Sequence, residues 1–184
     1  PKAEILFVGA LGRMEMTKVP EAGYEIVGLP ISGLQRKLTF SNFLLPFKIL
    51  KSLFMARKVI KDFQPELVIG VGGYASGPTL KMATLLKVPT LIQEQNSYPG
   101  KTNILLSKKA SLICTAYEGL SKFFPEDKIR LTGNPVRKDL SDRNMNRKEA
   151  HQIFGLNPDH KTILILGGSL GAKTLNDAMM GMLN

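Results

Sequence analysis

The chain has 184 residues, 43% of them hydrophobic, so it can bury one domain core and part of a second. The formal net charge of +10 favours partners that carry phosphate, nucleic acid or anionic lipid, but it does not indicate a fold. The single cysteine excludes an intramolecular disulfide, and no apolar run reaches the roughly 20 residues that a membrane-spanning helix needs.

Short apolar segments alternate with helical segments along the chain. The pattern predicts strands at 5–8, 24–29, 67–71, 90–93, 112–115, 129–132 and 162–166. It predicts helices at 46–63, 78–86, 101–110, 118–124, 147–154 and 172–183. Such alternation is typical of an α/β protein with Rossmann-like parallel sheets flanked by helices. In these folds ligands bind beyond the carboxyl ends of the strands.

A polar stretch divides this pattern. Residues 137–146 lack strand character, which predicts a first domain at 1–136, a linker at 137–146 and the beginning of a second domain at 147–184. The chain starts directly before a strand and stops inside a helical pattern, so we expect a fragment of a longer protein.

The helix expected at 46–63 has two apolar stripes. At 100° per residue, the stripe that we expect to face the core consists of Ile49, Leu53, Ala56, Ile60 and Phe63. The second stripe, on nearly the opposite side, consists of Phe47, Leu50 and Phe54, with Phe43 preceding it. Basic residues surround the second stripe: Lys51, Arg57, Lys58 and Lys61. Apolar side chains ringed by lysines fit insertion into an anionic membrane surface. Alternatively, a neighbouring element or a partner protein covers them.

Two glycine-rich loops follow predicted strands. The runs Leu67–Pro78 and Thr162–Ala172 each stop at a glycine pair before a helical pattern resumes. Glycines let backbone N–H groups approach an anion, and the following helix points its positive end towards it. The two loops together predict a protein that handles a phosphorylated ligand.

Polar residues follow two further strands. Glu94 comes directly after the strand at 90–93. There it could act as a base, accept a hydrogen bond from a sugar hydroxyl, or cap the helix near Thr102. Arg137 leaves the tight turn Gly133-Asn-Pro, where it could bind a phosphate or a ring, or form a surface ion pair.

The remaining reactive side chains predict no site. His151 and His160 lack ligand spacing to a cysteine or carboxylate cluster, so we predict no metal site and expect both to be solvated. Cys114 lies in an apolar run and is expected to pack in the core.

Six segments in the same order resemble the MurG family of bacterial glycosyltransferases. They are Gly12-Arg-Met-Glu15 with Val19–Tyr24, Ile31-Ser-Gly33, Ile69–Pro78, Gln93–Asn96 with Pro99-Gly100 and Thr102-Asn103, Gly133–Arg137, and Gly167–Ala172. The resemblance implies a GT-B fold, in which two Rossmann-like domains face each other across a cleft. It also implies inverting transfer of N-acetylglucosamine from UDP-N-acetylglucosamine to lipid I, forming lipid II for peptidoglycan synthesis. No cofactor is implied.

The resemblance also implies a location and partners. Family members act at the cytoplasmic face of the inner membrane as peripheral proteins, and the patch Phe43, Phe47, Leu50, Phe54, Lys51 and Lys58 falls in their membrane-binding region. The implied partners are UDP-N-acetylglucosamine, lipid I, an anionic membrane surface and other cell-wall synthesis proteins, with no nucleic acid.

Site residues follow by the matching motifs. The donor would be bound by Asn96, Arg137, Gly168, Ser169 and Gly171, and the acceptor diphosphate by Gly72, Gly73, Tyr74, Ser76 and Gly77. Backbone N–H groups and a helix dipole at 168–172 would stabilise the departing diphosphate. Glu94 would meet the reacting sugars as the candidate catalytic residue within this sequence.

Two departures from the family pattern bear on catalysis. An earlier glycine loop ending in a histidine, the favoured candidate for the base, has no counterpart in this sequence, and Gln93 stands where a histidine is frequent. Most of the second domain is also absent, so we expect the 184-residue chain alone to be inactive.

Two other classes of protein remain open on the sequence. One is a nucleotide-dependent Rossmann oxidoreductase, although Gly70–Gly77 has the wrong glycine spacing and Lys87 stands where an acidic ribose binder would be needed. The other is a non-enzymatic basic binding module, which lacks a series of stacking aromatic residues.

Overall fold

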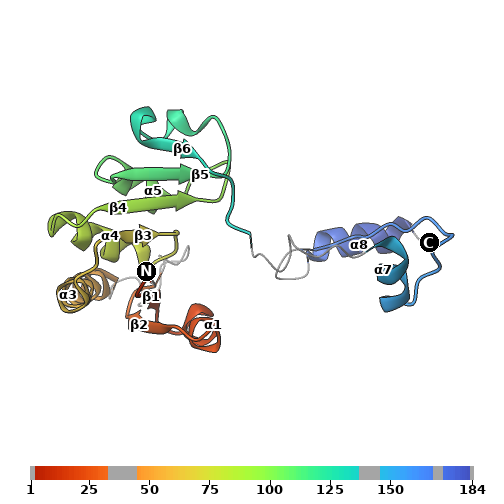
Figure 1. The fold of residues 1–184 in the computed structure, drawn as a ribbon, viewed down its shortest axis with the longest axis horizontal. Coiled ribbons are helices and arrows are strands. Elements are labelled where there is room, and N and C mark those ends of the chain that lie inside the picture. Colours follow the sequence, from red (N-terminus) through yellow and green to blue (C-terminus); the bar gives the residue numbers. More distant parts are fainter. Residues whose placement is uncertain (1–2, 33–44, 137–145, 168–171, 183–184) are drawn as a thin grey trace. The chain divides into compact units, whose positions relative to one another are not determined.

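The computed structural model describes residues 3–32, 45–136, 146–167 and 172–182. The chain divides into two compact units, Pro1–Pro135 and Val136–Asn184, which are described separately (Figure 1).

The first unit contains two parallel sheets. Strands β1 (Leu6–Ala10) and β2 (Glu25–Leu29) pair along their full length, from Leu6 opposite Glu25 to Ala10 opposite Leu29. A second sheet has the order β3-β4-β5-β6, and all its neighbours are parallel. Its strands are β3 (Val68–Gly70), β4 (Thr90–Glu94), β5 (Leu112–Thr115) and β6 (Ile129–Leu131). The predicted α/β class with parallel strands is confirmed.

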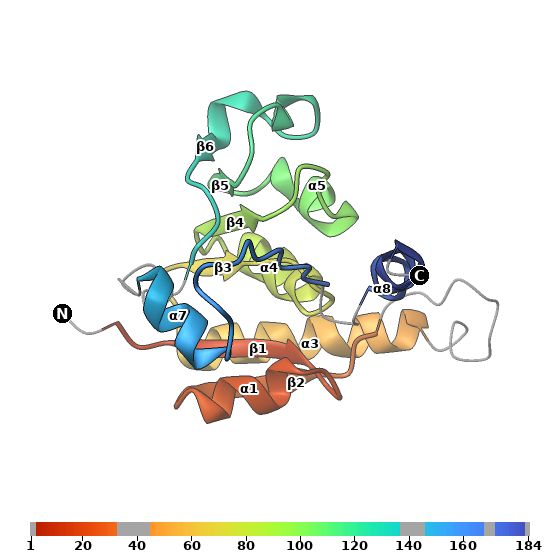
Figure 2. The same cartoon turned by 90° about the vertical axis from the view of Figure 1, so that its right-hand side faces the viewer.

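Helices connect the strands of the first unit. They are α1 (Glu15–Glu21), α3 (Leu45–Phe63), α4 (Ser76–Leu85), α5 (Lys101–Ser107) and the short 3-10 helices η1 (Leu120–Lys122) and η2 (Glu126–Lys128). In Figures 1 and 2 the β1–β2 pair lies between α1 and α3. Helix α1 was not predicted; it contains Pro20 near its end. The helix predicted at 118–124 reduces to η1, because Gly119 takes a left-handed conformation directly before it.

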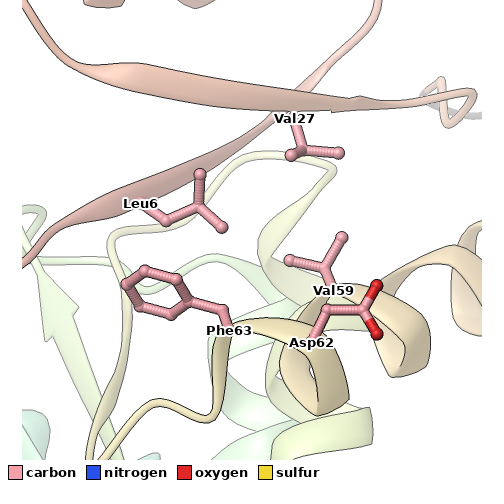
Figure 3. A pocket seen from close by; sticks show the side chains of 5 residues that line it. All are labelled: Leu6, Val27, Val59, Asp62 and Phe63. Atoms are coloured by element: carbon pink, nitrogen blue, oxygen red, sulfur yellow. The ribbon is translucent and has the colours of Figure 1, made fainter.

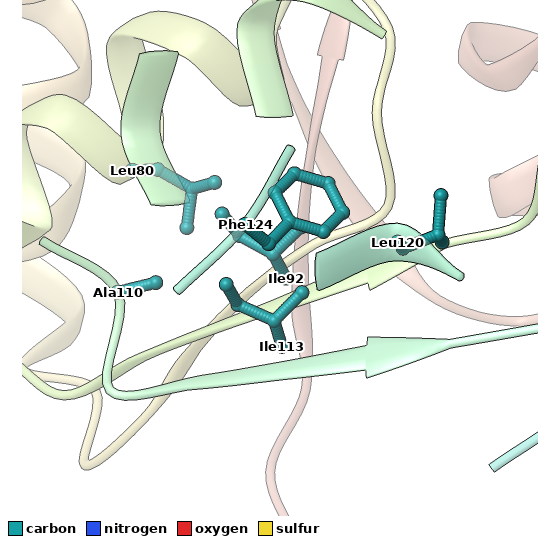
Figure 4. Packing of buried hydrophobic residues seen from close by; sticks show 6 residues of the cluster. All are labelled: Leu80, Ile92, Ala110, Ile113, Leu120 and Phe124. Atoms are coloured by element: carbon teal, nitrogen blue, oxygen red, sulfur yellow. The ribbon is translucent and has the colours of Figure 1, made fainter. Parts of the chain in front are cut away.

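The core of the second sheet lies between α4, the strands and η1. Six buried side chains converge there: Leu80, Ile92, Ala110, Ile113, Leu120 and Phe124 (Figure 4). Burying each of the larger ones contributes about 1.5–3 kcal/mol. Cys114 is also buried, which confirms its predicted place in the core. A second cluster of Ala10, Leu29, Ala56 and Ala75 joins β1 and β2 to α3 and α4.

Gly70 lets the start of α4 lie directly against the end of β3. A Cβ at Gly70 would stand 2.3 Å from Leu80 Cδ1 and 2.7 Å from Ser76 Oγ. Real Cβ atoms do not approach other heavy atoms so closely, so any other residue at position 70 would require Leu80 and Ser76 to shift. The absence of a side chain at Gly70 thus allows this close approach.

Helix α3 buries a narrow face. Ser52, Ala56 and Ile60 are buried, whereas Ile49, expected in the core, is 40% exposed. The helix packs on α4 and β2, and the small residues Ser52 and Ala56 allow close contact there. The prediction was wrong at Ile49 because the buried face begins only at Ser52. Within the described ranges, no helix combines the length and apolar character needed to traverse a bilayer.

A pocket lies between α3 and the β1–β2 pair (Figure 3). It has a volume of about 270 Å³, and Leu6 and Val27 face Val59, Asp62 and Phe63 across it. None of these lining residues belongs to the predicted site.

The second unit contains helices α7 (Arg147–Ile153) and α8 (Lys173–Met182). A capping box starts α7: Asn146 Oδ1 accepts from the Glu149 N–H, and the Glu149 carboxylate accepts from the Asn146 N–H.

Two predictions for the second unit were wrong. Residues 162–166 form no strand, and Ile163, Leu164 and Leu166 are more than 80% exposed. A strand requires a hydrogen-bonded neighbour, and the described residues of this unit supply none. His151 is 7% exposed rather than solvated, because its Nδ1 lies 2.7 Å from the Arg147 carbonyl oxygen and its Nε2 lies 3.4 Å from Thr162 Oγ1.

Candidate functional site

Three loops follow strands of the second sheet at the same edge. They come after β3 (71–75), β4 (95–100) and β6 (132–136), and parallel strands place all three at their carboxyl ends. Side-chain amides tie the loops together: Gln95 Nε2 donates to the Val71 carbonyl at 3.2 Å, and Gln93 Nε2 donates to the Gly133 carbonyl at 3.3 Å. The structure thus brings together three of the segments predicted to form the site.

The loop after β3 offers unpaired backbone donors. Gly72 and Gly73 have φ angles of 89° and 78°, which favour glycine. Within the described part of the chain, the N–H groups of Gly72, Gly73 and Tyr74 donate no hydrogen bond, and no side chain caps α4. Free N–H groups before a helix of ten residues are suited to an anion.

A positive charge lies beside this loop. The Arg13 guanidinium carbon is 5.4 Å from the centroid of the Tyr74 ring, and Tyr74 itself is 48% exposed. Arg13 occupies the turn between β1 and α1, so a separate segment contributes the charge. We did not single out Arg13 from the sequence. Its position directly after a parallel strand was the available signal.

Ser76 and Gly77 do not belong to the exposed part of the loop. The Ser76 hydroxyl is buried, faces Gly70 and has no hydrogen-bond partner among the residues that the structure describes. A Cβ at Gly77 would stand 3.4 Å from Thr102 Cγ2 of α5, so this glycine lies where two helices meet. Of the five predicted acceptor-binding residues, Gly73 and Tyr74 are exposed, Gly72 and Gly77 are half-buried, and Ser76 is buried.

Glu94 ends β4 inside the fold, with 1% of its surface exposed. Its Oε1 accepts hydrogen bonds from the Asn96 N–H at 3.0 Å and from Asn96 Nδ2 at 3.1 Å. Its Oε2 accepts from the Gly100 N–H at 3.1 Å and from Asn103 Nδ2 at 2.8 Å. Gly100 is the N-cap of α5, so Glu94 accepts a hydrogen bond from a backbone N–H at the start of that helix. Capping this helix was one of its predicted roles.

The surroundings of Glu94 favour its ionised form. Burial alone would raise the pKa of the Glu94 carboxyl, but the hydrogen bonds from Asn103, Asn96 and Gly100 outweigh it and hold this pKa below its ordinary value. Asn96 is exposed at the surface of the same loop, at the carboxyl edge of the sheet.

Several predicted residues lie outside the described residues: Phe43, Arg137, Gly168, Ser169 and Gly171. Among the residues that the structure does describe, no group of three or more His, Cys, Asp and Glu side chains could hold a metal ion.

Close relatives are found among curated bacterial proteins named UDP-N-acetylglucosamine--N-acetylmuramyl-(pentapeptide) pyrophosphoryl-undecaprenol N-acetylglucosamine transferase. One from Phocaeicola vulgatus is 61% identical over 180 residues, which are 98% of this chain and 48% of the relative. Another from Parabacteroides distasonis is 60% identical over 184 residues, covering all of this chain and 50% of the relative. The chain thus spans about half the length of the curated relatives it matches.

Solved structures agree with the fold. The crystal structure of Acinetobacter baumannii MurG matches 98% of this chain and 48% of that protein, with a TM-score of 0.69 and 32% identity. A glycosyltransferase from Rickettsia africae shares the fold at a TM-score of 0.56 and 11% identity.

The family match covers most of the first unit, including two of its three loops. The glycosyltransferase family 28 N-terminal domain matches residues 2–115, which include the loops after β3 and β4 and the turn that holds Arg13. The chain therefore belongs to glycosyltransferase family 28.

Proposed function

We propose that this protein serves in the transfer of N-acetylglucosamine from UDP-N-acetylglucosamine to a lipid-linked N-acetylmuramyl acceptor. The observation that carries the proposal is the 61% identity, over 98% of this chain, to a relative named for that reaction. Membership of a glycosyltransferase family favours this reaction over the oxidoreductase and binding-module alternatives.

The open loop after β3 is the proposed binding site for the acceptor diphosphate. The N–H groups of Gly72, Gly73 and Tyr74, which have no partner among the described residues, can donate to phosphate oxygens. Arg13 adds a full positive charge beside Tyr74, and charge-assisted hydrogen bonds are the stronger kind.

The donor is proposed to bind through Asn96, Arg137, Gly168, Ser169 and Gly171. The support is the match of their motifs to those of the family, together with the exposed position of Asn96 at the carboxyl edge of the sheet. In the reaction, an acceptor hydroxyl attacks the anomeric carbon while UDP departs. N–H groups and positive charge near the departing diphosphate would stabilise the growing negative charge.

The exposed stripe of α3 is the proposed contact with an anionic membrane, at the cytoplasmic face of the inner membrane. Phe47, Leu50 and Phe54 are 66%, 53% and 66% exposed. Lys51 and Lys58 are exposed beside them, and neither forms an ion pair in the part of the chain that the structure describes. Apolar side chains with unneutralised lysines suit headgroups and the acyl boundary.

The transfer reaction is tested with a chimaera in which this chain replaces the aligned segment of the Phocaeicola vulgatus relative. We expect the chimaera to move labelled N-acetylglucosamine onto lipid I, and the 184-residue chain alone to show no turnover. A folded chimaera without transfer, beside an active parent relative, would refute the proposal.

The membrane contact is tested by flotation of the 184-residue chain with phosphatidylglycerol vesicles. We expect binding to be lost in the Phe47→Asp/Phe54→Asp variant. Phe154→Asp is the matched control, since Phe154 is 74% exposed in the second unit. Equal flotation with uncharged phosphatidylcholine vesicles, or equal loss in the control, would contradict the proposal.

A further inference from the structure

We infer that Glu94 is a positioning residue, which orients the Asn96 side chain so that its Oδ1 accepts a hydrogen bond from a hydroxyl or N–H group of the bound sugar. The inference rests on the proposed transferase function and assigns each of the two residues a distinct role within that site.

The first step is that the Glu94 carboxylate has no capacity left for a substrate proton. Each oxygen already accepts two hydrogen bonds from N–H groups at 2.8–3.1 Å. With 1% of its surface exposed, the side chain cannot touch a ligand in this arrangement. A general base must lie within hydrogen-bond reach of the proton it takes, and Glu94 does not meet this condition.

The second step is that an ionised carboxylate fixes the amide groups around it. A carboxylate only accepts hydrogen bonds, so Asn96 and Asn103 must both turn their NH₂ groups towards Glu94. Asn103 shows how strong this preference is, because its Oδ1 is left buried and without a partner in the described ranges. The hydrogen bonds that lower the pKa of Glu94 keep it ionised at neutral pH.

The orientation of the Asn96 amide decides which of its atoms faces outwards. Its NH₂ group faces Glu94, so its Oδ1 is the group left over, and among the described residues this oxygen has no partner. The residue is exposed at the edge of the sheet where ligands of such folds bind. Sugar hydroxyls and an acetamido N–H are hydrogen-bond donors of the matching kind.

The neighbouring bonds hold this arrangement in place. The Asn96 backbone N–H is bound to the same Glu94 oxygen as its side chain, and Gln95 is tied to the loop after β3 through Val71. Asn96 is thus held through its backbone N–H and through the residue before it, which limits the directions its side chain can take.

The experiment measures sugar transfer by the chimaera carrying Glu94→Gln, Asn96→Asp or both. A glutamine places an NH₂ group against two of the four donors, so we expect kcat/KM for UDP-N-acetylglucosamine to fall about 10- to 100-fold. Asn96→Asp alone places a second carboxylate beside Glu94, and we expect it to lower kcat/KM at least as much. In the double variant, the NH₂ group of the introduced glutamine can donate to the introduced aspartate, which keeps an outward oxygen, so we expect at least a fivefold recovery over Glu94→Gln.

The pH profile separates positioning from base catalysis. If Glu94 only positions Asn96, an acidic limb of kcat whose midpoint lies above pH 4.5, where Glu94 stays ionised, keeps that midpoint in Glu94→Gln. If Glu94 were instead a general base, that limb would disappear in Glu94→Gln and the double variant would show no recovery of activity. Either result would overturn the inference. The matched control is Glu118→Gln, the same change at an exposed glutamate, for which we expect wild-type kinetics.

A readout that does not need activity uses the 184-residue chain. We expect the side-chain NH₂ resonances of Asn96 and Asn103 to shift together in Glu94→Gln and to stay unchanged in Glu118→Gln; unchanged Asn96 resonances in a folded Glu94→Gln chain would also overturn the inference. An inactive wild-type chimaera would refute the proposed function instead, so the two failures are distinguishable.

Discussion

The loops after β3 and β4 end neighbouring parallel strands, yet they satisfy their backbone donors in opposite ways. In the β4 loop, the Glu94 carboxylate accepts from four N–H groups and is sealed from solvent. In the β3 loop, the N–H groups of Gly72, Gly73 and Tyr74 have no partner within the described chain. One loop contains its own anion, whereas the other is open to an anion from outside. The same edge of a sheet can therefore supply both a rigid support and a binding surface.

The closed loop should be the more sensitive to loss of its anion. Glu94→Ala leaves four donors without their acceptor, and we expect the free energy of unfolding of the first unit to fall by about 3 kcal/mol. Urea denaturation of the 184-residue chain measures this. Glu118→Ala, at an exposed glutamate, serves as the control. An equal loss of unfolding free energy in that variant would contradict the stabilising role of the buried Glu94 carboxylate.

The closed loop should also respond to acid. Because the folded-state pKa of Glu94 is lowered from 4.5, its stabilisation is fully present above pH 4.5 and is lost as the pH falls through the lowered value. Glu94→Gln should remove this part of the acid sensitivity. The check is the urea midpoint as a function of pH; parallel curves for the wild type and Glu94→Gln would show that the carboxylate is not responsible.

The open loop should depend on the left-handed conformation of Gly73. Gly73→Ala places a side chain at a φ of 78°, which costs about 1–2 kcal/mol, so we expect roughly tenfold weaker binding of inorganic pyrophosphate. Calorimetry on the 184-residue chain measures the affinity. Gly119→Ala, at a φ of 75° outside the site, should lower stability similarly and leave this affinity unchanged.

The smallest effect is expected at Arg13, which adds charge to the open loop without forming its backbone. Arg13→Ala should weaken pyrophosphate binding about fivefold, with the affinity of the wild type more sensitive to salt than that of the variant. Arg130→Ala removes the same charge from β6, the strand furthest from β3 in the sheet order, and should have no effect on binding.

Local patterns in the sequence were sufficient to predict most helices and strands of the first unit, and those site residues whose role depends on near neighbours in the chain. The strand at 112–115 lies where apolar periodicity places it, and the glycine pair at 72–73 has the left-handed backbone that its composition favours. Both features depend on neighbours close in sequence. The helix cap that Glu94 provides was among its predicted roles for the same reason, since Gly100 is six residues away.

Features that depend on distant partners were missed. Arg13 is 61 residues from Tyr74 in sequence, and nothing in its immediate surroundings indicates that the two meet. His151 is buried because it lies against the backbone of α7 and Thr162, although charged residues are frequent in the same helix. The split of the first unit into two sheets likewise reflects strand pairing, which apolar periodicity does not encode.

The cross-links between the three loops have an evolutionary consequence. Gln93 and Gln95 donate to main-chain carbonyl oxygens, at Gly133 and Val71, which are present whatever side chain those positions carry. Mutations on the receiving loops therefore leave the acceptors intact, and drift there is tolerated as far as the backbone path allows. A substitution at either glutamine, in contrast, removes a cross-link even when the receiving loop is unchanged.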